Sequence, residues 1–208
     1  MKCAVNYVRA KKRLSDNYEK ILRYADQLQS LSMRENYRYG AQLMSEFDRK
    51  SGELIQYYID RYAQENEPDE DYAVNGYYAI VRDLCGYGWD PEIHLWRKNV
   101  FEQYPPDTNS ASVHKIWERR LVFAKGISFY VREMYAGSAL YLRDERGFAE
   151  ERLARAIHPA RNGYLELMRQ YMRCSAAGDR EMSRLIAETD KKYNEMLEKV
   201  FKNKRKEG

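Results

Sequence analysis

Apolar side chains recur at three- and four-residue intervals through most of this 208-residue chain, and this periodicity is the strongest constraint on its fold. The first clear instance joins Leu14, Tyr18, Ile21, Ala25 and Leu28 at spacings of 4, 3, 4 and 3. Side chains spaced in this way share one face of an α-helix, whereas a half-buried strand alternates at every second residue. No long run of the chain alternates in that way. We therefore expect an all-α protein.

Residues that start and stop helices divide the first half of the chain. Ser32 is followed three residues later by a glutamate, which is the spacing of a capping box, so we expect a second helix to begin at Ser32. A third helix is expected over residues 73–84, with Gly86 as its left-handed stop. Asp90 precedes a proline and is expected to cap a fourth helix.

The second half of the chain contains the longest apolar pattern. It begins at Val113 and continues to Gly147, so we expect one long central helix there. Pro159 is expected to break or kink the next helix, because proline lacks a donor and clashes with the preceding turn. Gly178 is expected to end that helix and Asp179 to cap the last one. The sequence therefore predicts a bundle of about seven helices.

Charge and polarity suggest how this bundle is divided. Residues 65–71 contain no apolar side chain, so we predict a helical hairpin at 1–66 and a main bundle at 72–208, with a single domain as the alternative. Residues 1–34 carry eight basic and three acidic side chains, and residues 35–71 carry four and ten. We expect these two oppositely charged segments to pack as an antiparallel pair.

The composition predicts a cytoplasmic protein that does not cross a membrane. The three cysteines are odd in number and far apart, which favours a reducing compartment. The most apolar stretch, residues 121–142, contains Lys125, Arg132 and Glu133, and these charges are too costly for the centre of a lipid-facing helix.

No motif predicts a metal or a cofactor. The three histidines lie outside any zinc-binding motif, and the cysteines form no pair with metal-ligand spacing. We therefore predict no metal site and no cofactor, and we favour a protein that is not an enzyme.

One fragment is similar to a catalytic motif. Arg152 and His158 are separated by five residues, which resembles the R-x(4 to 6)-H pattern of HEPN-type helical ribonucleases. The resemblance implies that the arginine and the histidine act together on an RNA phosphate. The chain departs from the family at Leu153, where the family often places a polar residue, and at Pro159, directly after the histidine. A HEPN-like ribonuclease is thus one alternative function.

Basic clusters define a second alternative, which is nucleic-acid binding. The net charge is only +4, from 36 basic and 32 acidic residues, so any such binding would depend on local patches. Tyrosines beside these patches could stack on unpaired bases. The candidate nucleic-acid-binding residues are Arg9, Lys11, Lys12, Arg13, Lys115, Arg119, Arg120, Lys202, Lys204, Arg205 and Lys206.

The preferred interpretation is a non-enzymatic helical interaction protein. The chain has 19 tyrosines against six phenylalanines and three tryptophans, and tyrosine is enriched at protein interfaces. Tyr78, Tyr87 and Trp89 fall outside the helical core face or in a glycine-containing loop, so we expect accessible rings there. We therefore predict a protein partner. The chain would then be an accessory or inhibitory factor of a mobile element that acts on a nucleic-acid-processing complex. The seam-like helices also allow a homo-oligomer.

Overall fold

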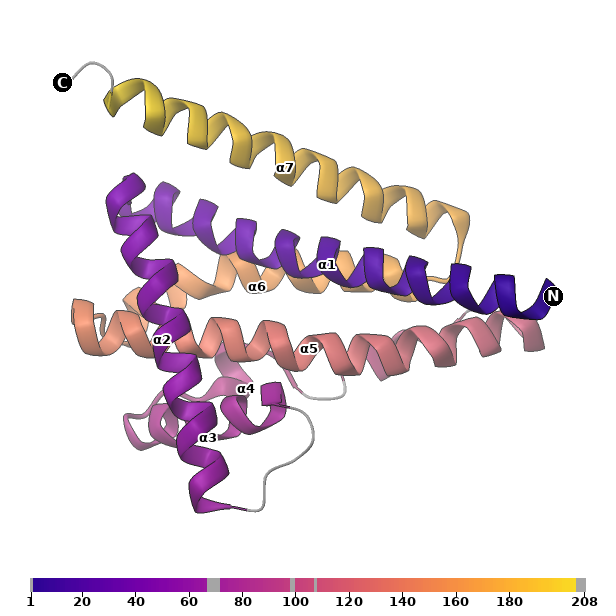
Figure 1. The fold of residues 1–208 in the computed structure, drawn as a ribbon, viewed down its shortest axis with the longest axis horizontal. Coiled ribbons are helices and arrows are strands. Elements are labelled where there is room, and N and C mark those ends of the chain that lie inside the picture. The colour runs from indigo at the N-terminus through magenta and orange to yellow at the C-terminus, as the bar shows by residue number, and fades with distance from the viewer. Residues whose placement is uncertain (1, 67–71, 98–99, 107, 205–208) are drawn as a thin grey trace.

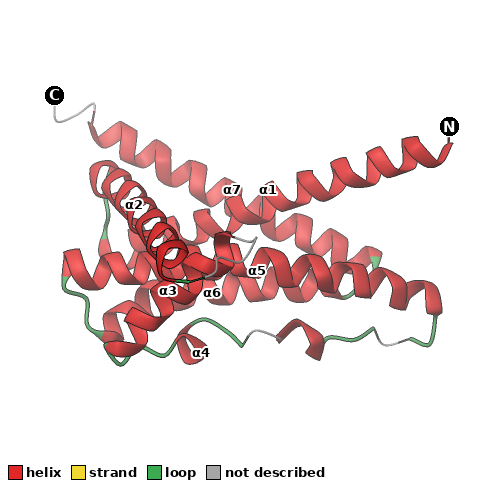
Figure 2. Ribbon diagram, turned by 60° about the horizontal axis from the view of Figure 1, so that its bottom comes forward, coloured by secondary structure: helices red, strands yellow, loops and turns green. Residues whose placement is uncertain are grey.

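The computed structural model describes residues 2–66, 72–97, 100–106 and 108–204, and these residues form helices and loops without strands (Figures 1 and 2). The all-α prediction is confirmed. The helices of this described part are α1 (Lys2–Tyr37), α2 (Ala41–Glu65), α3 (Tyr72–Gly86), α4 (Pro91–His94), the 3-10 helix η1 (Val100–Gln103), α5 (Ala111–Arg146), α6 (Glu150–Met172) and α7 (Ala176–Lys204).

Helix α5 is the centre of the bundle, as its long apolar pattern predicts. It contacts α1, α2, α3, α6 and η1, and nearly every side chain between residues 131 and 142 is buried. The helix ends at Gly147, which has a φ of 64° and donates its N–H to the Arg143 carbonyl. Figure 1 shows α1, α6 and α7 along the same direction as α5, with α2 across them.

Helices α1 and α2 do not form the antiparallel pair that their opposite charges predict. Helix α1 packs against α6 and α7, whereas α2 packs against α3 and α5 and crosses the bundle (Figure 1). The chain turns sharply between them at Arg38, which has a φ of 55°. Whether residues 1–66 fold as a separate unit stays a prediction.

Helix α1 is held to α6 by hydrogen bonds from side chains to backbone carbonyls. Ser32 Oγ donates to the Ala156 carbonyl at 2.7 Å, and Tyr37 Oη donates to the Arg152 carbonyl at 2.7 Å. The prediction that Ser32 caps a second helix is therefore wrong. Ser32 lies inside α1, and its buried hydroxyl bonds to a carbonyl of α6. The sequence signal for a cap does not exclude such a tertiary partner.

Helix α6 continues through Pro159, so the helix is not broken there, and the predicted kink stays a prediction. Proline removes one N–H from the helix and leaves the carbonyl four residues earlier without that donor. That carbonyl belongs to Arg155, and it accepts a hydrogen bond from Asn36 Nδ2 on α1 at 3.5 Å. Packing against α1 thus offsets part of the cost of the proline.

Two other predicted boundaries are shifted. Gly86 is the last residue of α3, and Gly88 takes the left-handed conformation instead, with a φ of 83°. Helix α7 begins at Ala176, before Gly178, and Ser175 Oγ accepts the Gly178 N–H at 3.1 Å. The cap predicted at Asp90 is confirmed, because its carboxylate accepts the backbone N–H of residue 92 at 2.8 Å, although α4 is only one turn long.

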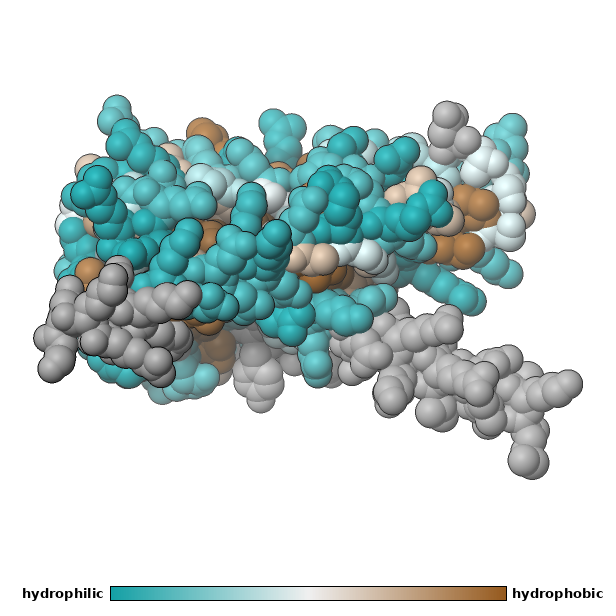
Figure 3. Space-filling view, turned by 90° about the horizontal axis from the view of Figure 1, so that it is seen from above, coloured by the Kyte–Doolittle hydropathy of each residue, from teal (hydrophilic) through white to brown (hydrophobic). Residues whose placement is uncertain are grey.

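Tyrosine rings form much of the interior. Tyr135, Tyr141 and Tyr164 are fully buried, and Tyr135 Oη donates to the Ala25 carbonyl at 3.0 Å. The α7 side of the molecule is mostly hydrophilic, with small separate hydrophobic areas (Figure 3). Among the described helices, none is both long enough and apolar enough to cross a bilayer.

Candidate interaction site

Residues 86–97, between α3 and α5, lie along one side of the bundle (Figure 2). We call this segment the anchored loop. Trp89 is only 2% exposed, and its ring stacks on His94 with 4.9 Å between centroids and 11° between planes. Trp96 is also buried and stacks on Tyr164 of α6 at 5.1 Å.

A pair of histidines joins the anchored loop to α6. His94 Nδ1 lies 3.2 Å from His158 Nε2, and His94 Nε2 lies 3.3 Å from Glu150 Oε1. Both contacts are satisfied with neutral rings when His158 Nε2–H donates to His94 Nδ1 and His94 Nε2–H faces the carboxylate. If both rings were in the charged, doubly protonated form, the Nδ1–H of His94 would point at the Nε2–H of His158. Desolvation, then the nearby Arg161 guanidinium and His94, lower the pKa of His158 from its ordinary value of 6.5.

Two arginines bind the loop, one at its backbone carbonyls and the other at the Glu92 carboxylate. Arg161 of α6 donates from Nη1 to the Ile93 carbonyl at 3.0 Å and to the His94 carbonyl at 3.4 Å. Arg132 of α5 is 2% exposed, lies 4.2 Å above the Tyr77 ring and pairs with Glu92 at 3.3 Å. The loop is therefore connected to α3, α5 and α6.

This anchoring leaves two large apolar side chains outside. Tyr87 is 70% exposed and Ile93 is 66% exposed. The Arg143 guanidinium covers one face of the Tyr87 ring at 3.6 Å from its centroid. Tyr78 is 41% exposed at the edge of the neighbouring Tyr77 and Phe129 rings. These three side chains and the anchored loop form what we call the loop surface.

The expected accessibility is thus confirmed for two of the three predicted interaction residues and wrong for the third. Tyr78 and Tyr87 are exposed, whereas Trp89 is buried because it packs on His94. Sequence reasoning missed the exposed Ile93. It also missed the histidine pair, since 64 residues separate its members.

The two residues of the ribonuclease-like motif lie in different surroundings. Arg152 places its guanidinium 4.0 Å above the Phe148 ring and 5.7 Å above the Tyr37 ring. His158 faces His94 instead. Six positions on a helix correspond to a rotation of about 240°, so the two side chains leave α6 in different directions.

The predicted nucleic-acid-binding residues are spread over the molecule. Lys115 and Arg119 are exposed on α5, whereas Arg120 is half-buried, donates to the Tyr171 carbonyl and pairs with Asp179 at 2.9 Å. The remaining candidates belong to the ends of the chain. Arg9, Lys11, Lys12 and Arg13 belong to α1 and Lys202 and Lys204 to α7, but their side chains, and all of Arg205 and Lys206, lie outside the described residues.

The two cysteine thiols that the structure describes are not activated as nucleophiles. Burial raises the pKa of the Cys85 thiol and of the Cys174 thiol, which favours the less reactive protonated form. Within the part of the chain that the structure describes, no three histidine, cysteine or carboxylate side chains gather as metal ligands do. Comparison with protein families, curated proteins and solved structures finds no match to this chain.

Proposed function

We propose that this chain is a helical interaction protein that binds a protein partner through the loop surface. The observation that carries the proposal is the exposure of Tyr87 and Ile93 on a loop whose tryptophan, leucine and histidine side chains are buried. Interface energy is concentrated in a few large side chains, and a rigid loop loses little conformational entropy when it binds. A preformed loop with exposed apolar side chains meets both conditions.

The contacts beneath the loop support this function over a purely structural one. A loop that only connects two helices would gain by burying Tyr87 and Ile93, because each buried side chain of this size contributes about 1.5–3 kcal/mol. Here Trp89, His94 and Trp96 are buried, while the two neighbouring apolar side chains face solvent. The separate surroundings of Arg152 and His158 favour binding over RNA cleavage.

Site-specific photo-crosslinking in the native host tests this proposal. A photoreactive phenylalanine analogue replaces Tyr87 in one variant and Val122 in the other, and crosslinked proteins are identified by mass spectrometry. Val122 is a matched control because it is 73% exposed, much as Tyr87 is. It is also far from Tyr87, since it lies about 30 Å along α5 from Arg143, whose guanidinium covers the Tyr87 ring. A discrete crosslinked partner from position 87 alone is the expected result.

Affinity measurements with that partner provide the second part of the test. The double variant Tyr87→Ala, Ile93→Ala should weaken binding by about tenfold or more, since truncation of central interface residues costs at least 1–2 kcal/mol. Val122→Ala should bind as the wild type does. Equal crosslinking at both positions, or unchanged affinity of a folded double variant, would refute the proposal.

A further inference from the structure

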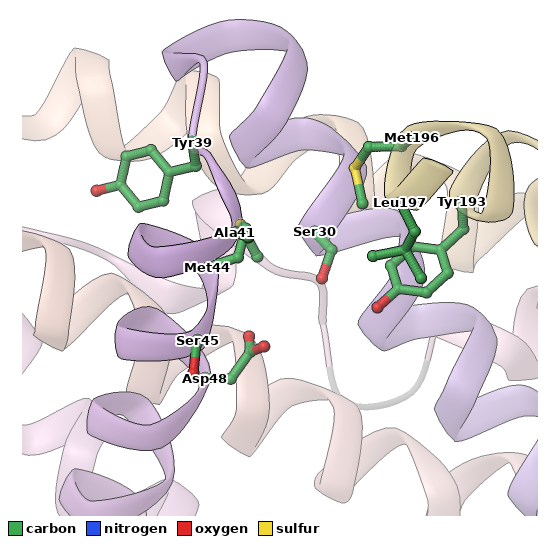
Figure 4. Close-up of a pocket in the computed structure, with 9 residues that line it drawn as sticks. All are labelled: Ser30, Tyr39, Ala41, Met44, Ser45, Asp48, Tyr193, Met196 and Leu197. Carbon is green, nitrogen blue, oxygen red and sulfur yellow. The ribbon is translucent and has the colours of Figure 1, made fainter. Parts of the chain in front are cut away.

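A separate cavity lies between α1, α2 and α7. Its volume is about 260 Å³, near the lower end of the range of about 300–1,000 Å³ that is usual for small-molecule sites. Met44 of α2 and Met196 and Leu197 of α7 contribute apolar walls (Figure 4). The cavity is therefore sized for a small ligand with an apolar part.

Three oxygen-bearing side chains from three helices point into this space. Figure 4 shows the Ser30 hydroxyl of α1, the Asp48 carboxylate of α2 and the Tyr193 hydroxyl of α7 directed toward one another. Ser30 is 3% exposed. Within the described part of the chain, none of the three side chains makes a hydrogen bond or an ion pair. A polar side chain that lines a cavity and makes no hydrogen bond to protein is free to bond to a ligand or to water.

The electrostatics of the cavity favour a cation. The Asp48 side chain lies at the exposed mouth of the cavity. Desolvation by the surrounding helices raises its pKa to about 6, and the Asp26 carboxylate of α1 adds to the effect. Burial and the same two carboxylates raise the pKa of Tyr193, so this hydroxyl stays protonated and neutral. At neutral pH the cavity thus contains an ionised carboxylate without a cationic partner among the described residues.

We propose that this cavity binds a small primary alkylamine in its protonated form. A primary ammonium group has three N–H donors, and Asp48, Ser30 and Tyr193 offer three acceptor groups around one point. The alkyl chain lies against the two methionines and Leu197, whose flexible, apolar side chains adapt to it. A neutral alcohol lacks the charge that Asp48 requires, and a quaternary ammonium lacks the N–H donors.

Isothermal titration calorimetry of the full chain with hexan-1-amine at pH 7.5 tests this inference. Hexan-1-ol and N,N,N-trimethylhexan-1-aminium are the two comparison ligands, and both should bind at least about tenfold more weakly than the amine. Asp48→Asn should reduce affinity for the amine by a similar factor. Glu53→Gln, which removes an exposed carboxylate on α2 outside the cavity, is the matched control and should leave affinity unchanged.

The pH dependence and the source of the amine give two further measurements. Affinity should fall as the pH decreases through about 6, because Asp48, facing Asp26 and Tyr193, then takes up a proton. A capped lysine that binds as well as hexan-1-amine would identify a lysine side chain as the natural source, and weaker binding would identify a free amine. Equal binding of the amine and the alcohol, or wild-type affinity in a folded Asp48→Asn variant, would overturn the inference.

Discussion

Replacement of Trp89 by alanine should destabilise the protein strongly, while replacement by phenylalanine should cost little. The Trp89 side chain is 2% exposed, and a buried tryptophan removes about 150–250 Å² from water. At about 25 cal/mol per Å² this burial contributes about 4–6 kcal/mol, and measured losses for such truncations are about 3–5 kcal/mol. We therefore expect Trp89→Ala to lower the free energy of unfolding by about 3–5 kcal/mol.

The phenylalanine variant isolates the indole N–H. Trp89 Nε1 is buried and has no hydrogen-bond partner among the described residues. Leaving such a donor unpaired costs about 1–3 kcal/mol, so its removal offsets most of the packing that the smaller ring loses. We expect Trp89→Phe to change the free energy of unfolding by less than about 1.5 kcal/mol.

Urea denaturation followed by circular dichroism at 222 nm measures both variants, provided the slope with urea concentration stays constant. Native-state hydrogen exchange then locates the effect, which should be largest in residues 86–97 for the alanine variant. Similar losses in both variants would mean that the indole N–H is satisfied in solution. A loss below about 1 kcal/mol for alanine would mean that the loop is not anchored by this ring.

Three further predictions test other parts of the structure. Gly76→Ala should destabilise by about 1–3 kcal/mol in urea denaturation, because the added methyl group would collide with the Glu133 carboxylate; Gly52→Ala, with open space around it, should stabilise by about 1 kcal/mol as its control. Ser32→Ala should cost about 1–3 kcal/mol by the same assay, since a buried carbonyl loses its bond, and an unchanged midpoint would refute the contact. The folded state lowers the pKa of His158, so below pH 6.5 the unfolded chain binds more protons and the free energy of unfolding of the wild type falls. His158→Gln should remove this loss of stability on acidification. Parallel thermal melting of wild type and variant from pH 8 to pH 5 would contradict this.

Periodicity and glycine stops predicted the helices well where the signal was long and local. The central helix ends at the expected Gly147, because a glycine after a long apolar pattern commonly takes the left-handed conformation that ends a helix. Ser32 misled because its short-range capping signal competes with a tertiary bond that the sequence does not reveal. The break at Pro159 failed for the same reason, since a residue on α1 compensates for the missing donor.

The candidate site was predictable in composition but not in geometry. The glycine-flanked aromatic loop was visible in the sequence. Two of the three predicted rings are exposed as expected, Tyr78 on α3 and Tyr87 in the loop. Burial of Trp89 depends on its stacking with His94, which in turn depends on His158 of a distant helix. The cavity is likewise assembled from α1, α2 and α7, so no local pattern in the sequence could indicate it.

The bonds between α1 and α6 have a consequence for how this protein tolerates change. All four acceptors on α6 are main-chain carbonyls, which every amino acid supplies, so sequence drift along α6 cannot delete them. The four donors are the side chains of Tyr24, Ser32, Asn36 and Tyr37. Related chains would therefore be recognised by this short donor pattern on the first helix sooner than by any residue of the helix that receives it.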